Sequence, residues 1–268
     1  MKQLSRAVFV ATVVLPLLAT TGIAFVYATG YFSPGEKAIV TTLFDERFLR
    51  SLLYTLILAF AVVVASCLVA LWISSRIPFS KTIPAWMLIP FAIPPVAAAF
   101  FTFQLFSGSG LASRLSYHAG WVSDSIHFLP LVNDALGVGV FSAHFMLCMP
   151  FLLVYFIYLK NSDEIYALGE TARSLGARKA QVWNTITRPL LLRRSVPLLL
   201  LFFLFVLGTY EIPLLLGSQS RRAVVPFIVD QIKGYSLAGI PRGYAQALLY
   251  GGLIAIFTLI MIKRPLRA

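Results

Sequence analysis

Long stretches without charged side chains dominate this chain of 268 residues. Five stretches carry no charge and a sixth carries one acidic residue; they cover 7–35, 51–75, 82–113, 135–159, 195–220 and 243–262. Each stretch is long enough for a helix to cross a bilayer, which takes roughly 20 apolar residues. Strands of membrane barrels are about half as long, so these continuous runs predict helices. Hydrophobic residues make up 59% of the chain, which excludes a disordered chain and argues against a soluble enzyme.

We therefore predict an all-α, polytopic membrane protein with six transmembrane helices in one transmembrane domain, residues 1–268. The predicted spans are 7–29, 51–73, 83–106, 136–159, 195–217 and 243–262. Lys2 and Arg6 precede the first span, and a cleaved signal peptide has a similar basic segment before its apolar stretch. The apolar stretch of the first span is longer than a signal core and five further spans follow, so we interpret it as a retained helix.

The distribution of Lys and Arg predicts the orientation in the membrane. Six spans place both termini on one side, and that side carries 14 of the 22 basic residues, half of them in the loop 160–194. Cytoplasmic loops are enriched in Lys and Arg, so this side is predicted to be cytoplasmic. The basic residues follow the membrane topology, which argues against nucleic-acid binding.

The loop 160–194 has the pattern of two short helices. Ser162 or Asp163 is a suitable N-cap. An apolar face follows, and Gly176 permits a helix stop before a second helix over 178–187. Pro189 and Pro197 bracket the return into the membrane. The members of the apolar face, at spacings of three or four, are Ile165, Leu168, Ala172 and Leu175. This pattern fits an amphipathic element on anionic lipid and a protein-docking surface about equally well.

The same loop resembles a family motif. Residues 170–176 read ETARSLG, nine residues follow, and residues 186–189 read ITRP. This resembles the signature loop of ATP-binding-cassette importer permeases: Glu-Ala-Ala, three residues, Gly, nine residues, Ile, any residue, Leu-Pro. Two positions depart from the pattern, because Thr171 replaces the first Ala and Arg188 replaces the Leu.

The resemblance implies a function for the loop. In that family the helix docks on a cytoplasmic ATPase dimer, and ATP-driven closure of the dimer moves the spans. The chain itself has no Gly-x4-Gly-Lys-Ser/Thr loop, so ATP would be used by the partner and no cofactor by this chain. Further implied partners are membrane lipid, a second permease subunit, the same or similar, and an extracytoplasmic substrate-binding protein; the implied location is a bacterial-type inner membrane. The docking residues implied are Glu170, Thr171, Ala172, Leu175, Gly176, Ile186 and Pro189.

A substrate path is predicted around the fifth span. Glu211 is the only acidic residue inside a predicted span, and such groups by default face the bundle interior. Tyr210 and Pro213 flank it, and proline with nearby glycines can break the helix. Pro94 and Pro95 predict a similar bend in the third span. Ordinary hydration of Glu211 near the outer interface is the alternative. The segment 208–217 also resembles the polyamine, thiamine and ferric-iron branch of the family, which suggests a small cation as substrate.

Two other classes of function remain open at this level. A stand-alone secondary carrier or channel usually has several intramembrane charges for ion coupling, and it leaves the loop 160–194 unexplained. An integral membrane enzyme needs a catalytic set near the interface, and His118, Asp124 and His127 have no motif around them. No metal site is predicted, because the histidines lack neighbouring ligands.

Overall fold

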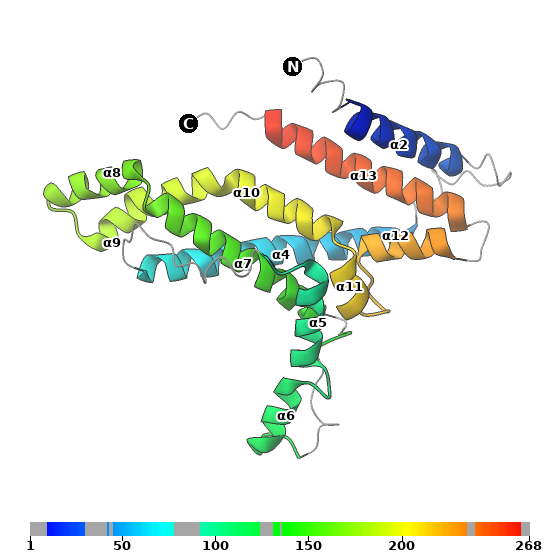
Figure 1. The fold of residues 1–268 in the computed structure, drawn as a ribbon, viewed down its shortest axis with the longest axis horizontal. Coiled ribbons are helices and arrows are strands. Elements are labelled where there is room, and N and C mark those ends of the chain that lie inside the picture. The colour runs from blue at the N-terminus through cyan, green and yellow to red at the C-terminus, as the bar shows by residue number, and fades with distance from the viewer. Residues whose placement is uncertain are drawn as a thin grey trace. The chain divides into compact units, whose positions relative to one another are not determined.

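The structure, a computed structural model, describes residues 10–29, 42, 45–77, 92–123, 131–134, 136–234 and 239–263. Its regular elements are all helices over these residues (Figure 1). Contacts divide the chain into two compact units, and the single transmembrane domain stays a prediction. The first comprises residues 1–53 with 223–268, and the second comprises residues 54–222.

Five helical stretches are long and apolar enough to cross a membrane, which confirms the all-α, multi-pass class. They are Glu46–Arg76, Pro95–His118, Val138–Lys160, Lys179–Gly208 and Gly239–Met261. The first predicted span corresponds to a shorter apolar helix, α2 (Leu15–Ala28), which follows a π-helical turn, η1 (Val10–Val14). Residues 1–9 of the chain lie outside the described residues, so the predicted first span, 7–29, stays a prediction.

The first unit packs α2 and α12 (Val224–Lys233) against α13 (Gly239–Lys263) (Figure 1). Tyr27 and Tyr244 stack with ring centroids 4.8 Å apart. Gly243 allows α12 and α13 to approach closely, because a Cβ there would lie 2.6 Å from the Ile232 side chain. Small residues and one aromatic stack therefore hold these helices together.

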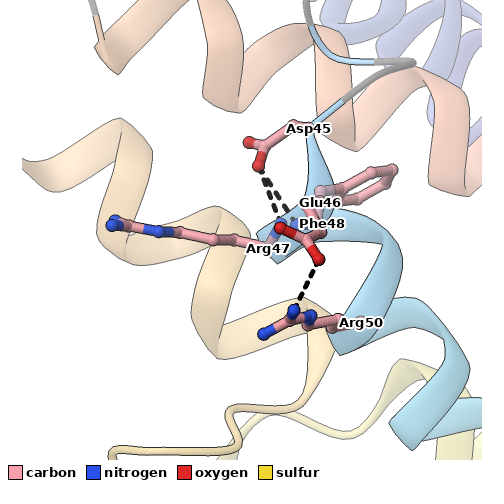
Figure 2. A network of polar contacts seen from close by, with 5 residues as sticks. All are labelled: Asp45, Glu46, Arg47, Phe48 and Arg50. Carbon is pink, nitrogen blue, oxygen red and sulfur yellow. Dashed lines mark hydrogen bonds and ion pairs between the residues drawn. The ribbon is translucent and has the colours of Figure 1, made fainter.

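Asp45 begins α4 (Glu46–Arg76) in this unit, as Figure 2 shows. Its carboxylate accepts hydrogen bonds from the backbone N–H groups of Arg47, at 3.0 Å, and Phe48, at 3.4 Å. These are two of the N–H groups that a helix start leaves without a partner in the helix. Gln246 of α13 donates a further hydrogen bond to the same carboxylate at 3.2 Å, so Asp45 joins two helices of the unit.

The second unit holds the remainder of α4 and the segments up to residue 222. They are α5 (Pro95–Phe106), α6 (Leu111–His118), α7 (Val138–Lys160), α8 (Asp163–Ser174), α9 (Lys179–Val182), the π-helical turn η4 (Trp183–Thr187), α10 (Arg188–Gly208) and α11 (Glu211–Leu216). One apolar cluster joins α4, α5, α7 and α11; its buried members include Leu58, Ala98, Ala99, Val140, Ala143, Leu147, Ile212 and Leu216. Burial of these apolar side chains stabilises the unit where they would otherwise be exposed to water. Where they would otherwise face lipid, this contribution is absent.

Two predicted spans differ from the helices observed. The fifth span is predicted over 195–217, but the helical stretch runs from Lys179 to Gly208 and breaks there, so α11 is a separate short helix. The described part of the third span starts at Pro95, and residues 107–110 form a turn between α5 and α6. Prolines 84 and 90 of that span lie outside the described residues. Thr209 and Ser107 are extended, which ends α10 and α5.

Candidate functional site

The predicted helix stop at Gly176 is present and has a defined geometry. Gly176 has φ +90°, a conformation that residues with a Cβ rarely adopt. Its N–H donates to the carbonyl of Arg173 at 2.9 Å, and the N–H of Ala177 donates to the carbonyl of Ala172 at 3.0 Å. These paired bonds are the Schellman motif that closes helix C-termini. The end of α8 is therefore held by its own backbone.

The apolar face predicted for α8 is divided between the interior and the surface. Ile165 is fully buried, and Gly169 packs beside Val182 of α9, 3.4 Å from where a Cβ would lie. Leu168 and Leu175, in contrast, are exposed, Leu175 by 84%. With the exposed Thr171 they are spaced three and four residues apart and share one side of the helix. We call Leu168, Thr171 and Leu175 the α8 stripe.

Glu170 is paired within its own helix. Its carboxylate lies 2.7 Å from the guanidinium of Arg173, and both side chains are about half exposed. Thr171 donates its hydroxyl to the carbonyl of Ala167, so the hydroxyl is satisfied within α8, and the residue is exposed on the α8 stripe. A partner's basic residue would therefore compete with Arg173 for Glu170, and an exposed pair of this kind is weak enough to exchange.

The second half of the predicted loop belongs to a long helix. From Lys179 the chain stays helical through η4 into α10, so Ile186 and Pro189 lie within this helical stretch and not in a separate connection. Pro189 has no backbone N–H to donate within the helix. It directly follows the π-helical turn η4, where the backbone hydrogen bonds already depart from the α-helical pattern. Ser162 does occupy the N-cap position of α8, but its hydroxyl bonds to Leu159 and does not cap the helix.

Side chains missed by the sequence reasoning tie this loop to the long helices. Arg194 of α10 pairs with Glu164 of α8 at 2.6 Å. Lys160, at the end of α7, is buried and donates to the backbone carbonyls of Ser74, at 2.9 Å, and Ile77, at 2.6 Å. From the sequence, Lys160 is only one of the basic residues that indicate the orientation in the membrane. Its hydrogen-bond acceptors cannot be predicted, because they are more than 80 residues away. Its position directly after an apolar run is the one signal available.

The residues predicted to form a substrate path lie at or in α5 and α11. These two helices are neighbours, because Ile212 and Leu216 of α11 share a buried cluster with Ala98 and Ala99 of α5. Glu211, at the first position of α11, is exposed and lies beyond the end of α10, so it is outside the helical stretch that can cross a membrane.

Proline and tyrosine residues of the predicted path have structural roles. Pro94 and Pro95 begin α5, where proline is well tolerated. Tyr210 is the N-cap residue of α11, and Pro213 is buried within it. The structure thus brings α5 and α11 together through apolar contacts, and the substrate path itself stays a prediction.

Comparison with known proteins adds no assignment. No model of a protein family matches the chain, and no curated protein matches it at a significant level. It is a multi-pass helical membrane protein. Within the described part of the chain, no three His, Cys, Asp or Glu side chains gather as a metal site requires.

Proposed function

We propose that this protein is the membrane-spanning permease subunit of an ATP-driven, binding-protein-dependent importer. The loop 160–194 would dock a separate cytoplasmic ATPase, and the long helices would form the translocation path with a second permease subunit. The observation that carries the proposal is the α8 stripe, an exposed apolar surface on a short helix with a rigidly closed end. The helix lies at one end of α7 and α10 (Figure 1), where a peripheral partner can reach it.

Charge supports a protein partner for α8 in preference to anionic lipid. The helix carries three acidic side chains, Asp163, Glu164 and Glu170, against the single basic Arg173. A helix that lies on an anionic membrane surface has a basic polar face, so α8 has the wrong sign for that role. Exposed leucines beside a carboxylate fit a partner cleft with an apolar floor and a basic rim.

Purification of the tagged chain in mild detergent, from cells that make it naturally, tests the proposal. We expect a subunit with a nucleotide-binding Gly-x4-Gly-Lys-Ser/Thr loop to co-purify, and the complex to hydrolyse ATP. Leu175→Asp should abolish this association, because it places a charge in the α8 stripe. Ser109→Asp is the matched control, since Ser109 is exposed in the turn between α5 and α6.

The same purification distinguishes the alternatives. A stand-alone carrier would purify without an ATPase, and in proteoliposomes it would accumulate substrate when only an ion gradient is imposed. Equal recovery of the ATPase with Leu175→Asp and with the wild-type chain would reject the docking surface.

A small cation such as a polyamine remains our proposal for the substrate. The exposed carboxylate of Glu211 begins α11, beside the apolar contact of α11 with α5. A carboxylate at that position would attract a cation approaching the helix pair from water. Polyamine uptake by the Glu211→Gln variant, compared with wild type at low ionic strength, tests this; unchanged uptake would remove Glu211 from the path.

A further inference from the structure

Three elements of the second unit meet at the Lys160 side chain. Lys160 is the last residue of α7, and its amine donates to the carbonyls of Ser74 and Ile77 at the C-terminal end of α4. The same amine lies 5.8 Å from the centroid of the Trp183 ring, which belongs to η4. We call these four residues the Lys160 joint.

The joint is stabilised by complementary charges. The last carbonyls of a helix lack partners within the helix and carry partial negative charge, so a cation placed there is favourable. Lys160 is only 5% exposed, and burial strengthens hydrogen bonds from a charged group. The Trp183 ring face adds a cation–π contact within the effective range of about 6 Å. The acceptors are backbone atoms, so the contact holds the end of α4 itself and not a mobile side chain.

Trp183 connects the joint to α8 through a short, packed path. It directly follows α9, and α9 contacts α8 where Val182 faces Gly169. Glu164 and Arg194 form a second tie between α8 and α10 at 2.6 Å. A displacement of α8 would therefore move η4 and the start of α10 with it, because α8 packs against α9 and η4, and α9 continues directly through η4 into α10.

We propose that Lys160 is a positioning residue that makes the cytoplasmic end of α4 move with the docking loop when a partner displaces that loop. This rests on the proposed function, which supplies the partner. The loop connects α7 and α10 directly, whereas α4 is distant in sequence. The Lys160 amine provides the contact by which α4 follows the same movement.

Hydrogen exchange of the detergent-purified complex with its ATPase tests the proposal, with ADP and then ATP plus vanadate as probes. In the wild-type complex we expect exchange in the last turn of α4, residues 73–77, to change at least about tenfold between the two states, the scale of a charge-assisted hydrogen bond. In Lys160→Met the change should disappear while ATP hydrolysis continues. Lys160→Arg should restore it, because a guanidinium can still donate to both carbonyls.

The outcomes separate the two proposals. A nucleotide-dependent change in Lys160→Met equal to that in the wild type would overturn the positioning role. A wild-type complex without ATPase would instead overturn the proposed function and the role that depends on it. A wild-type complex that contains the ATPase but shows no nucleotide-dependent change in α4 would overturn the positioning role alone. If Lys160→Met does not fold, Trp183→Leu gives the same test, since it removes the contact of the amine with η4. An unaltered response in Trp183→Leu would also reject the joint.

Discussion

Replacing Gly176 with alanine should open the end of α8 without disturbing anything around it. A Cβ at position 176 would meet no atom within 4 Å, so no clash contributes. The cost comes from the backbone alone, because φ is +90°. A residue with a Cβ pays about 1–2 kcal/mol in the left-handed region. A free energy of this size lowers the ratio of closed to open turn by roughly 5–30-fold.

The assay is hydrogen exchange at the amides that close the turn. The N–H of residue 176 bonds to Arg173 and that of Ala177 bonds to Ala172, and both bonds break when the turn opens. We expect exchange of these two amides to accelerate by roughly 5–30-fold in Gly176→Ala. Gly176→Asn should show a smaller effect, since asparagine tolerates positive φ better than alanine.

Gly251→Ala is the matched control for this prediction. Gly251 also has open space around its Cβ position, but it lies inside α13 with an ordinary helical backbone. Alanine there should leave exchange in the loop unchanged and stabilise α13 by roughly 0.5–1 kcal/mol. If Gly176→Ala leaves the protection of Ala177 at the wild-type level, the positive φ and the closed turn are not what stabilises the end of α8.

Three further substitutions test the packing of each unit by thermal unfolding in detergent. Gly139→Ala should destabilise by about 1–3 kcal/mol, because a Cβ would lie 2.7 Å from the backbone oxygen of Leu131; an unchanged melting temperature would contradict this approach. Ile212→Ala should cost about 2–5 kcal/mol, since Ile212 is fully buried in the α5–α11 cluster, and a cost below 1 kcal/mol would place it at the surface. Asp45→Ala should cost about 0.5–2 kcal/mol through loss of the α4 N-cap, and Asp45→Asn should retain most of the stability; equal losses would assign the effect to the charge facing Gln246.

The sequence predicts long apolar helices well, because each segment must by itself supply enough apolar residues to cross a bilayer. The bounds of α7, Val138–Lys160, agree closely with the predicted span 136–159. The fifth span was less predictable. Hydrophobicity continues from α10 into α11, so composition does not reveal the break after Gly208, which is a change of backbone angles at Thr209. The second half of the loop 160–194 is predicted as a separate helix because Pro189 resembles a helix start, whereas the π-helical turn η4 accommodates it within one helical stretch.

The sequence does not predict which apolar residues of α8 are buried and which are exposed. Periodicity correctly groups Ile165, Leu168 and Leu175 on one face of a helix. It does not say which edge of that face is buried, because α8 packs against α9 and η4, which lie beyond the turn at Gly176. Ile165 is therefore buried and Leu175 exposed, although both are apolar residues with equivalent positions in the pattern.

The membrane class, most of the long helices, the basic loop and the glycine that ends α8 depend on neighbouring residues, so they can be predicted from the sequence. The outward-facing residues of α8 and the partners of Lys160 become visible only in the folded chain. The physical reason is distance along the chain. Lys160 bonds to carbonyls 83 and 86 residues away, and every residue has a carbonyl, so no side-chain pattern marks those acceptors in advance.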